Sequence, residues 1–177
     1  MLGPLPLAQG NLKYVVVAVE YFSKWIEAKP LATITLATIQ KFFWQSIVCR
    51  FGVPKAITVD NGTHFDAETF KAFCSQIGTK IHFASVRHPE SNGLVERANG
   101  IIITVIMKSI FNHPKGKWPD ELIKVVRSHN TAVSRSIGFT PFKLLLSDEA
   151  ITPEEARTGS IRTLALTKIL PRRGLPI

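Results

Sequence analysis

Residues 14–31 read YVVVAVEYFSKWIEAKPL, and this stretch decides the fold. The first six residues are apolar and mostly β-branched, which favours a strand that is buried on both faces. In residues 25–31, one set of side chains (Trp25, Glu27, Lys29) alternates with another (Ile26, Ala28), as in a half-exposed second strand. The two runs are close enough in sequence to form an antiparallel pair.

Downstream of this hairpin, the spacing of apolar residues changes from two to about four. Thr33 or Thr35 caps a predicted helix that runs to about Arg50. Gly52, followed by Pro54, ends it. The core-facing side of this helix is predicted to comprise Ile39, Phe43 and Ile47.

A second strand–helix–strand unit follows. Residues 55–59 predict a short strand that stops at the turn signal of residues 60–62. Asp66 is the predicted N-cap of the next helix, and residues 80–83 alternate in another short strand. The apolar face of the intervening helix is predicted to be Phe70, Phe73, Cys74 and Ile77.

Three helices are expected in the remaining part. Ser91, in a polar loop over residues 87–93, is expected to cap a long helix over residues 92–111. Trp118 opens the next helix, with Pro and acidic residues in its first turn. Thr140 opens a short last helix that ends near residue 146.

This order of strands and helices predicts an α/β layer fold with a mixed sheet. Ligands in such sheets meet the carboxyl ends of strands. Asp60 lies at one such end, directly after residues 55–59.

Composition and charge narrow the function classes. Hydrophobic residues make up 45% and charged residues 20%, which excludes wholesale disorder. The net charge of +9 favours a polyanionic partner such as nucleic acid, although a basic protein without such a partner stays open. We expect no membrane span and no signal peptide, and hence an intracellular chain with Cys49 and Cys74 as buried free thiols.

The alternation of strand-like and helix-like segments weakens beyond residue 147, so we expect the chain to consist of two parts. Residues 1–150 form the predicted core and residues 151–177 a basic, loosely ordered tail. The tail is either a solvated segment or an arm that contacts phosphates.

Two carboxylates are candidates for a metal site. Asp60 ends a strand and Glu96 lies in the first turns of a helix that can fold back over that strand end. Mg²⁺ favours one or two carboxylates plus substrate phosphates. From spacing alone, Asp60 as a cap of its own turn and Glu96 as a solvated helix residue stay open.

Together these segments resemble the catalytic core of retroviral-type integrases, and those of gypsy-type retrotransposons most of all. Besides residues 14–31, the resemblance rests on FGVPKAITVDNGTHF (51–65), HPESNGLVERAN (88–99) and residues 118–142, which end in GFTPF. It implies a ribonuclease H-like mixed sheet flanked by helices. It also implies Mg²⁺ or Mn²⁺ as cofactor, and DNA strand transfer in the nucleus between element ends and a target.

The resemblance assigns Asp60 and Glu96 as catalytic residues and metal ligands. The family's first catalytic Asp precedes a Gly-Pro pair by two apolar residues, and here Met1 and Leu2 fill those two places before Gly3. The first strand is therefore expected to be truncated and the chain as given to be inactive, with two of three carboxylates. Glu20 is the one substitute to weigh, and a polar strand-end role is the expectation for it.

The turn at residues 60–62 and the helix region around Glu96 supply the expected DNA contacts. The candidates are Asn61, Ser91, Asn92, Arg97, Asn99 and Lys108, each of which is otherwise a solvated side chain. Gly100 departs from the family, which usually has a basic residue there. The histidines and cysteines show no paired zinc-site spacing.

The expected function is therefore that of an integrase core fragment, a homodimer or higher oligomer when intact. Two rivals stay open: a ribonuclease H-like nuclease that cuts without joining, and a non-enzymatic module for DNA binding or dimerisation.

Overall fold

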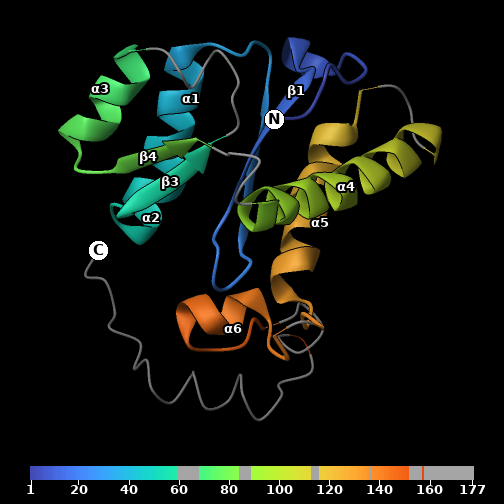
Figure 1. Cartoon of the computed structure of the whole chain (residues 1–177). Coiled ribbons are helices and arrows are strands. Elements are labelled where there is room, and N and C mark those ends of the chain that lie inside the picture. Colours follow the sequence, from blue (N-terminus) through green and yellow to red (C-terminus); the bar gives the residue numbers. More distant parts are fainter. Residues whose placement is uncertain (60–67, 84–88, 113–115, 136, 152–156, 158–177) are drawn as a thin grey trace, which may run out of the picture.

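The computed structural model describes residues 1–59, 68–83, 89–112, 116–135, 137–151 and 157. Two small sheets lie between helices, as Figure 1 shows. One sheet is antiparallel and the other is parallel, and the candidate site lies between them.

The first sheet is the hairpin that residues 14–31 predicted. β1 (Tyr14–Val19) pairs antiparallel with β2 (Ile26–Leu31), so that Tyr14 lies opposite Leu31. The antiparallel pair is confirmed, and β2 begins one residue later than expected.

The second sheet consists of two parallel strands. β3 (Ala56–Val59) pairs with β4 (Lys80–Phe83), and α3 (Glu68–Gln76) lies between them in the sequence. The mixed α/β class is confirmed, but the expected single sheet is not: the described strands form two separate two-stranded sheets. On the side of β1 away from β2, the only described pairing at the strand itself is a bridge between Leu2 and Val15.

The helix after the hairpin is not a uniform α-helix. α1 (Leu36–Phe42) continues into a π-helical turn (Phe43–Val48) and then into α2 (Cys49–Phe51). Thr35, not Thr33, is the N-cap, and its hydroxyl accepts the Thr38 N–H at 3.3 Å. Cys49 is exposed, so its predicted burial was wrong, whereas Cys74 on α3 is fully buried.

The later helices follow the sequence prediction with one correction. α4 (Pro89–Asn112) begins before Ser91, which therefore lies inside the helix and is not its cap. α5 (Trp118–Thr131) begins where predicted, with acidic residues in its first turn. α6 (Pro141–Leu146) is capped by the Thr140 hydroxyl, which accepts the Lys143 N–H at 3.0 Å.

Helices cover both faces of the hairpin. Val15 packs in one apolar cluster with Ile102 of α4 and Leu122 of α5, while Val16 packs in another with Phe42 of α1. Neighbouring residues of a strand point to opposite faces. The helices α4 and α5 therefore cover one face of β1 and α1 covers the other, as the apolar run of β1 predicted.

A truncated first strand predicts that the residues before Gly10 are loosely held, and this prediction was wrong, because they pack against the core. Leu2, Leu5 and Ala8 are all buried. Leu2 and Ala8 donate backbone N–H groups to Val15 and Leu12 at 2.9 Å, and the Trp118 indole donates to the Pro6 carbonyl at 2.8 Å. A short segment with this many partners stays ordered without forming a full strand. Among these residues is a short 3-10 turn, η1 (Gln9–Asn11).

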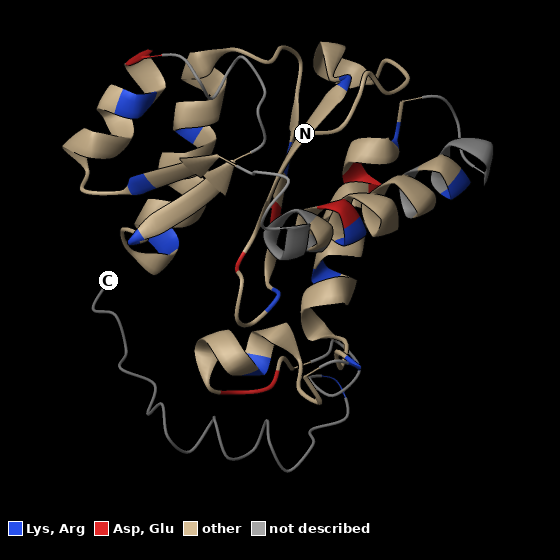
Figure 2. Ribbon diagram, in the orientation of Figure 1, with Lys and Arg blue, Asp and Glu red and all other residues tan. Residues whose placement is uncertain are grey.

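Charge is spread over the surface. Figure 2 shows Lys and Arg of the described residues on most of the helices and on both sheets. Within the described residues, no helix is both long enough and apolar enough to span a bilayer.

Candidate functional site

A cavity of about 780 Å³ lies between the two sheets. β1 and β3 line it along its length, α1 closes one wall and the first turns of α4 contribute to another. Most lining side chains are apolar. Among the described residues, three carboxylates also line it, those of Glu20, Glu27 and Glu96, and each has a different environment.

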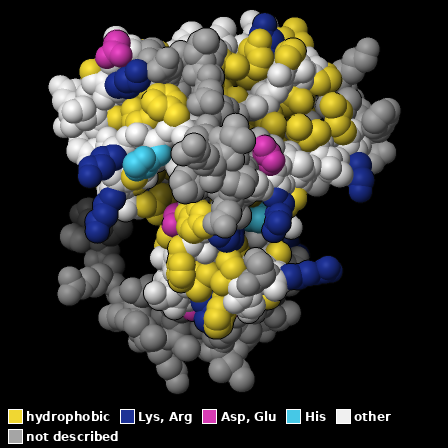
Figure 3. Space-filling model, viewed as in Figure 1, with side chains coloured by type: hydrophobic (Ala, Val, Ile, Leu, Met, Phe, Trp, Pro, Cys, Tyr) yellow, Lys and Arg dark blue, Asp and Glu magenta, His cyan; other side chains and the backbone are white. Residues whose placement is uncertain are grey.

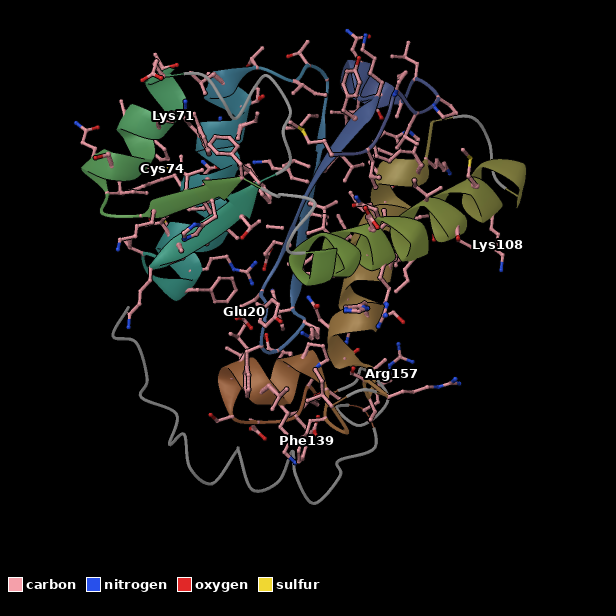
Figure 4. All side chains as sticks on the ribbon, in the orientation of Figure 1. Glu20, Lys71, Cys74, Lys108, Phe139 and Arg157 are labelled. Atoms are coloured by element: carbon pink, nitrogen blue, oxygen red, sulfur yellow. The ribbon has the colours of Figure 1, made fainter. Side chains whose placement is uncertain are left out.

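Glu20 stabilises the turn of the hairpin. Its carboxylate accepts the Phe22 N–H at 3.0 Å and both the N–H and the hydroxyl of Ser23 at 2.6 Å. Partial burial opposes ionisation, but these hydrogen bonds and the charge of Lys24 outweigh it and hold the pKa of Glu20 below its ordinary value. Figure 4 shows Glu20 at the far end of the hairpin. Because its oxygens are already used in this way, the polar strand-end role describes it well.

Glu27 is also committed to protein contacts. It accepts the Trp25 indole N–H at 2.7 Å and forms an ion pair with Arg50. Sequence reasoning missed this residue, although a signal was present: residues two apart on a strand share a face, so the Trp-x-Glu spacing brings the two side chains together.

Glu96 is the third carboxylate that the described residues contribute to the cavity. It is exposed on α4 and lines the cavity together with Val59, the last residue of β3. Among the described residues it makes no ion pair or side-chain hydrogen bond. Asp60 and Asn61 lie outside the described residues.

A divalent cation fits the chemistry of Glu96. A free, exposed carboxylate is a hard oxygen ligand of the kind Mg²⁺ prefers. In the described part of the chain, no group of three or more His, Cys, Asp or Glu side chains could hold a metal. A site here therefore needs Glu96 together with ligands beyond the described residues or from a bound substrate.

The predicted DNA-contacting residues on α4 are spread along it. Arg97 and Lys108 are both exposed. They are eleven residues apart, which is close to three full turns and about 16 Å, so they lie on the same side of the helix. Lys108 lies well along the helix from the cavity (Figure 4). Ser91 and Asn92 belong to the first turn of α4, and nothing is described of their side chains.

Asn99 is set apart from these exposed side chains. It lines the cavity, and its Oδ1 atom is buried with no hydrogen-bond partner in the described structure. An unpaired buried acceptor costs stability, so this amide is available to a donor that enters the cavity.

Exposed aromatic side chains lie in the turn of the hairpin. Figure 3 shows hydrophobic side chains over this part of the molecule, and Tyr21 and Phe22 in the turn are 56% and 71% exposed. Sequence reasoning read this turn only as a connection and missed its exposed aromatic residues.

The basic tail predicted beyond residue 150 falls mostly outside the described residues. Arg157 is the one described residue of the tail beyond Ile151, and it is exposed.

Comparison with known proteins identifies the family of this architecture. Residues 3–89 match the Integrase core domain family. The chain is 33% identical over 141 residues to the Gag-Pol polyprotein of woolly monkey sarcoma virus, covering 79% of this chain and 8% of that protein. It is 33% identical over 153 residues to the Pro-Pol polyprotein of simian foamy virus type 3 (strain LK3), covering 86% of this chain and 13% of that protein.

A solved structure matches at the level of the fold as well. The HTLV-2 integrase catalytic core domain, determined in complex with magnesium, superposes with a TM-score of 0.62 and 26% identity over 74% of this chain and 83% of that one. The chain spans only 8% to 13% of the length of the two polyproteins. It carries a retroviral-type integrase core domain, related to the catalytic cores of retroviral integrases.

Proposed function

We propose that this chain is the catalytic part of an integrase that joins element DNA to target DNA by phosphoryl transfer. The observation that carries the proposal is the position of Glu96 in the same cavity as the carboxyl end of β3. Asp60 follows Val59 directly, and consecutive Cα atoms are about 3.8 Å apart. Asp60 therefore follows directly from a strand end that lines the same cavity as Glu96.

The metal in this proposal is Mg²⁺ or Mn²⁺, held by Asp60 and Glu96 with oxygens of the DNA. Such an ion supplies stabilisation of the charge on the reacting phosphate. The protein's own contribution would be to hold Glu96 on α4 and to place Asp60 next in sequence to β3, since metal ligands act best on rigid elements. The relative with 26% identity that was solved with magnesium supports this choice.

DNA would follow α4 away from the cavity. Arg97 and Lys108 are exposed on one side of this helix and would contact backbone phosphates, which position DNA without reading its sequence. Asn61, Ser91, Asn92 and Asn99 are the proposed contacts nearer to the metal. The net charge of +9 supports a polyanionic substrate.

The finer assignment is to integrases of gypsy-type retrotransposons, acting in the nucleus as a homodimer or higher oligomer. It rests on the sequence segments 14–31, 51–65, 88–99 and 118–142. The viral polyproteins reported above support the wider family.

The test compares two forms of the chain in a strand-transfer assay with Mg²⁺ and Mn²⁺. For the chain as given we expect no measurable transfer, because Asp60 and Glu96 alone would hold the metal poorly and their charges would repel one another. A form extended upstream by an apolar strand ending in Asp directly before Met1 is expected to be active.

In the extended form, Asp60→Asn or Glu96→Gln should abolish transfer, while Glu20→Gln should leave most of it, because Glu20 is engaged by the hairpin turn. If the unextended chain shows strand transfer and Glu20→Gln removes it, Glu20 is the third ligand. DNA nicking without joining would identify a nuclease. DNA binding that survives chelation, with no cleavage by the extended form, would identify a binding module.

A further inference from the structure

An exposed apolar surface lies where the hairpin turn meets α6. Tyr21 and Phe22 in the turn are 56% and 71% exposed, and Leu146 of α6 is 50% exposed. Phe142 of α6 packs against Trp25, next to the turn, with ring centroids 6.0 Å apart. Helix residues four apart lie on the same side, so Leu146 is on the side of α6 that meets the hairpin. We call Tyr21, Phe22 and Leu146 the tip surface.

We propose that the tip surface binds a segment of the same chain, residues 163–170 (TLALTKIL). This segment lies outside the described residues. It has one charge, that of Lys168, and four large apolar side chains: Leu164, Leu166, Ile169 and Leu170. A run this short cannot bury its apolar side chains against itself, so it gains free energy by covering an apolar surface elsewhere.

The hairpin turn holds its aromatic side chains in place before anything binds. The Glu20 carboxylate accepts the N–H groups of Phe22 and Ser23, at 3.0 and 2.6 Å. Lys24 has a φ of +63°, which residues other than glycine seldom adopt. Its carbonyl lies 3.0 Å from Nε2 of His129 on α5. A surface fixed in this way loses little conformational entropy when a segment binds to it, and this favours binding.

The charges around the tip surface favour an apolar segment over a polyanion. Three cations at this end of the molecule have a carboxylate beside them: Lys24 has Glu20, Arg50 pairs with Glu27, and Lys143 lies 3.6 Å from Glu149. Their charges are therefore largely compensated within the chain. Asp148 is exposed and has no ion pair among the described residues. The single cation of the segment thus has a carboxylate available beside α6.

The covalent connection favours this segment over a second copy of the chain. Leu166 follows Ile151 by 15 positions, a stretch that spans up to about 50 Å at about 3.3 Å per residue. The tip surface itself includes Leu146, five positions before Ile151. A segment tethered so closely has an effective concentration on the order of mM. Two whole chains, each with a net charge of +9, repel one another instead.

The test is paramagnetic relaxation enhancement in the full chain. A nitroxide is attached to Thr167→Cys in a Cys49→Ser background, because Cys74 is buried and stays unlabelled. The backbone N–H signals of Tyr21 and Phe22 should lose at least about half of their intensity, since a segment at an effective concentration in the mM range stays bound even when its intrinsic affinity is weak. If neither signal is weakened, the proposal is wrong.

Leu7 is the internal control, because it is an exposed apolar residue away from the tip surface. It is 62% exposed, and its carbonyl lies against Gly116, just ahead of the first residue of α5. The hairpin turn contacts the other end of that helix, at His129. The N–H signal of Leu7 should keep its intensity. A loss equal to that of Phe22 would show non-specific apolar contact and overturn the proposal.

Variants of the surface test where the segment binds. The double variant Phe22→Ser and Leu146→Ser changes only exposed side chains, so the fold should be kept. It should restore the N–H signal of Tyr21. Leu7→Ser, the matched control, should leave that signal weakened. If Tyr21 stays weakened in the double variant, the segment lies elsewhere and the proposal fails.

Variants of the segment test which residues bind. Leu166→Ser together with Ile169→Ser removes two of the four large apolar side chains and should also restore the Tyr21 signal. Leu175→Ser, in the tail but outside the segment, should have no effect. A restored signal in the Leu175→Ser variant alone would assign the binding to another part of the tail.

A mixed sample distinguishes the tethered segment from a second copy. Nitroxide-labelled chains are mixed with isotope-labelled chains that carry no nitroxide. Signal loss at Tyr21 in the mixture that rises with concentration and is absent within one chain would assign the tip surface to a second copy and overturn the proposal. Figure 1 shows the turn and α6 at the other end of the molecule from the carboxyl end of β3. Because no readout requires metal, DNA or activity, the result is independent of the proposed function.

Discussion

Asn130 joins two parts of the chain that are 104 positions apart. Its Oδ1 accepts the Ile26 N–H and its Nδ2 donates to the Ile26 carbonyl, both at 2.9 Å. Asn130 is 4% exposed and Ile26 1%, so water cannot replace these bonds. One side chain therefore docks α5 onto the first residue of β2.

We expect Asn130→Ala to lower the free energy of unfolding by about 2–4 kcal/mol. The substitution leaves a buried donor and a buried acceptor unpaired, and each costs about 1–3 kcal/mol. Urea denaturation measures the change. Ser128→Ala, at an exposed position of the same helix, is the control and should change stability by less than about 0.5 kcal/mol. An equal loss in both variants would contradict the docking role.

Glu20 predicts a dependence of stability on acid. Its folded-state pKa lies below the ordinary value of 4.5. The ionised form is therefore favoured by folding, and its contribution is present above about pH 4.5 and is lost as the pH falls through the lower, folded-state pKa.

We expect the midpoint of thermal unfolding to fall more steeply with acid in the wild type than in Glu20→Gln below pH 4.5, and the two proteins to differ most near neutral pH. Scanning calorimetry from pH 3 to pH 7 measures this. Parallel curves for the two proteins would show that the turn does not depend on the charge of Glu20.

At the residue scale, the sequence predicted roles that follow from local pattern and missed those that follow from distant contact. Thr140 and Cys74 behave as expected, because a cap and an apolar stripe are local features. Asn130 gave no signal, since its partner lies 104 positions away. Asp60, the second proposed metal ligand, lies outside the described residues and stays a prediction.

At the scale of the element, Gly100 is an unfavourable residue for the stability of α4. The position is exposed, and a Cβ atom added there would meet nothing within 4 Å. Glycine in a helix interior costs about 1 kcal/mol against alanine, chiefly through the entropy of the unfolded chain.

We expect Gly100→Ala to raise the free energy of unfolding by about 0.5–1 kcal/mol, measured by urea denaturation. Gly78→Ala is the matched control. A Cβ atom would also meet nothing there, but Gly78 has a φ of +81°, so the same substitution should destabilise. If both variants change stability in the same direction, backbone conformation is not what separates the two sites.

Element types were predicted more reliably than element ends. The β1 run and the start of α5 match the sequence, because both have strong local signals. Ser91 was a reasonable cap by residue type, yet α4 starts at Pro89, a residue suited to a first helical turn. The π-helical turn after α1 had no sequence signal that the apolar spacing could reveal.

At the scale of the whole molecule, the charge of +9 predicts weak, non-specific DNA binding with a strong salt dependence. A chain that ends after residue 155 loses five basic residues: Arg157, Arg162, Lys168, Arg172 and Arg173.

We expect this truncation to lower both the affinity for duplex DNA and the slope of log affinity against log salt. Each lost phosphate contact reduces that slope by about 0.9. Fluorescence anisotropy between 50 and 200 mM salt measures both. An unchanged slope would show that the tail does not contact phosphates.

The fold class could be predicted because strand and helix patterns alternate along the chain. The division into two sheets could not, since it depends on which edges meet in space. Leu2 pairs with Val15 through two backbone bonds that no side-chain pattern encodes. The cavity, which is the centre of the candidate site, follows from that division.

The two thiols differ in accessibility, so chemical labelling can time a local opening of the protein. Cys49 is open to solvent, whereas Cys74 is shielded in α3, where burial raises the pKa of its thiol and keeps the reactive thiolate scarce. An alkylating reagent should therefore modify the first at once and the second only when α3 opens. The delay between the two labels reports how often the β3–β4 half of the protein loosens in the native state, without any engineered probe.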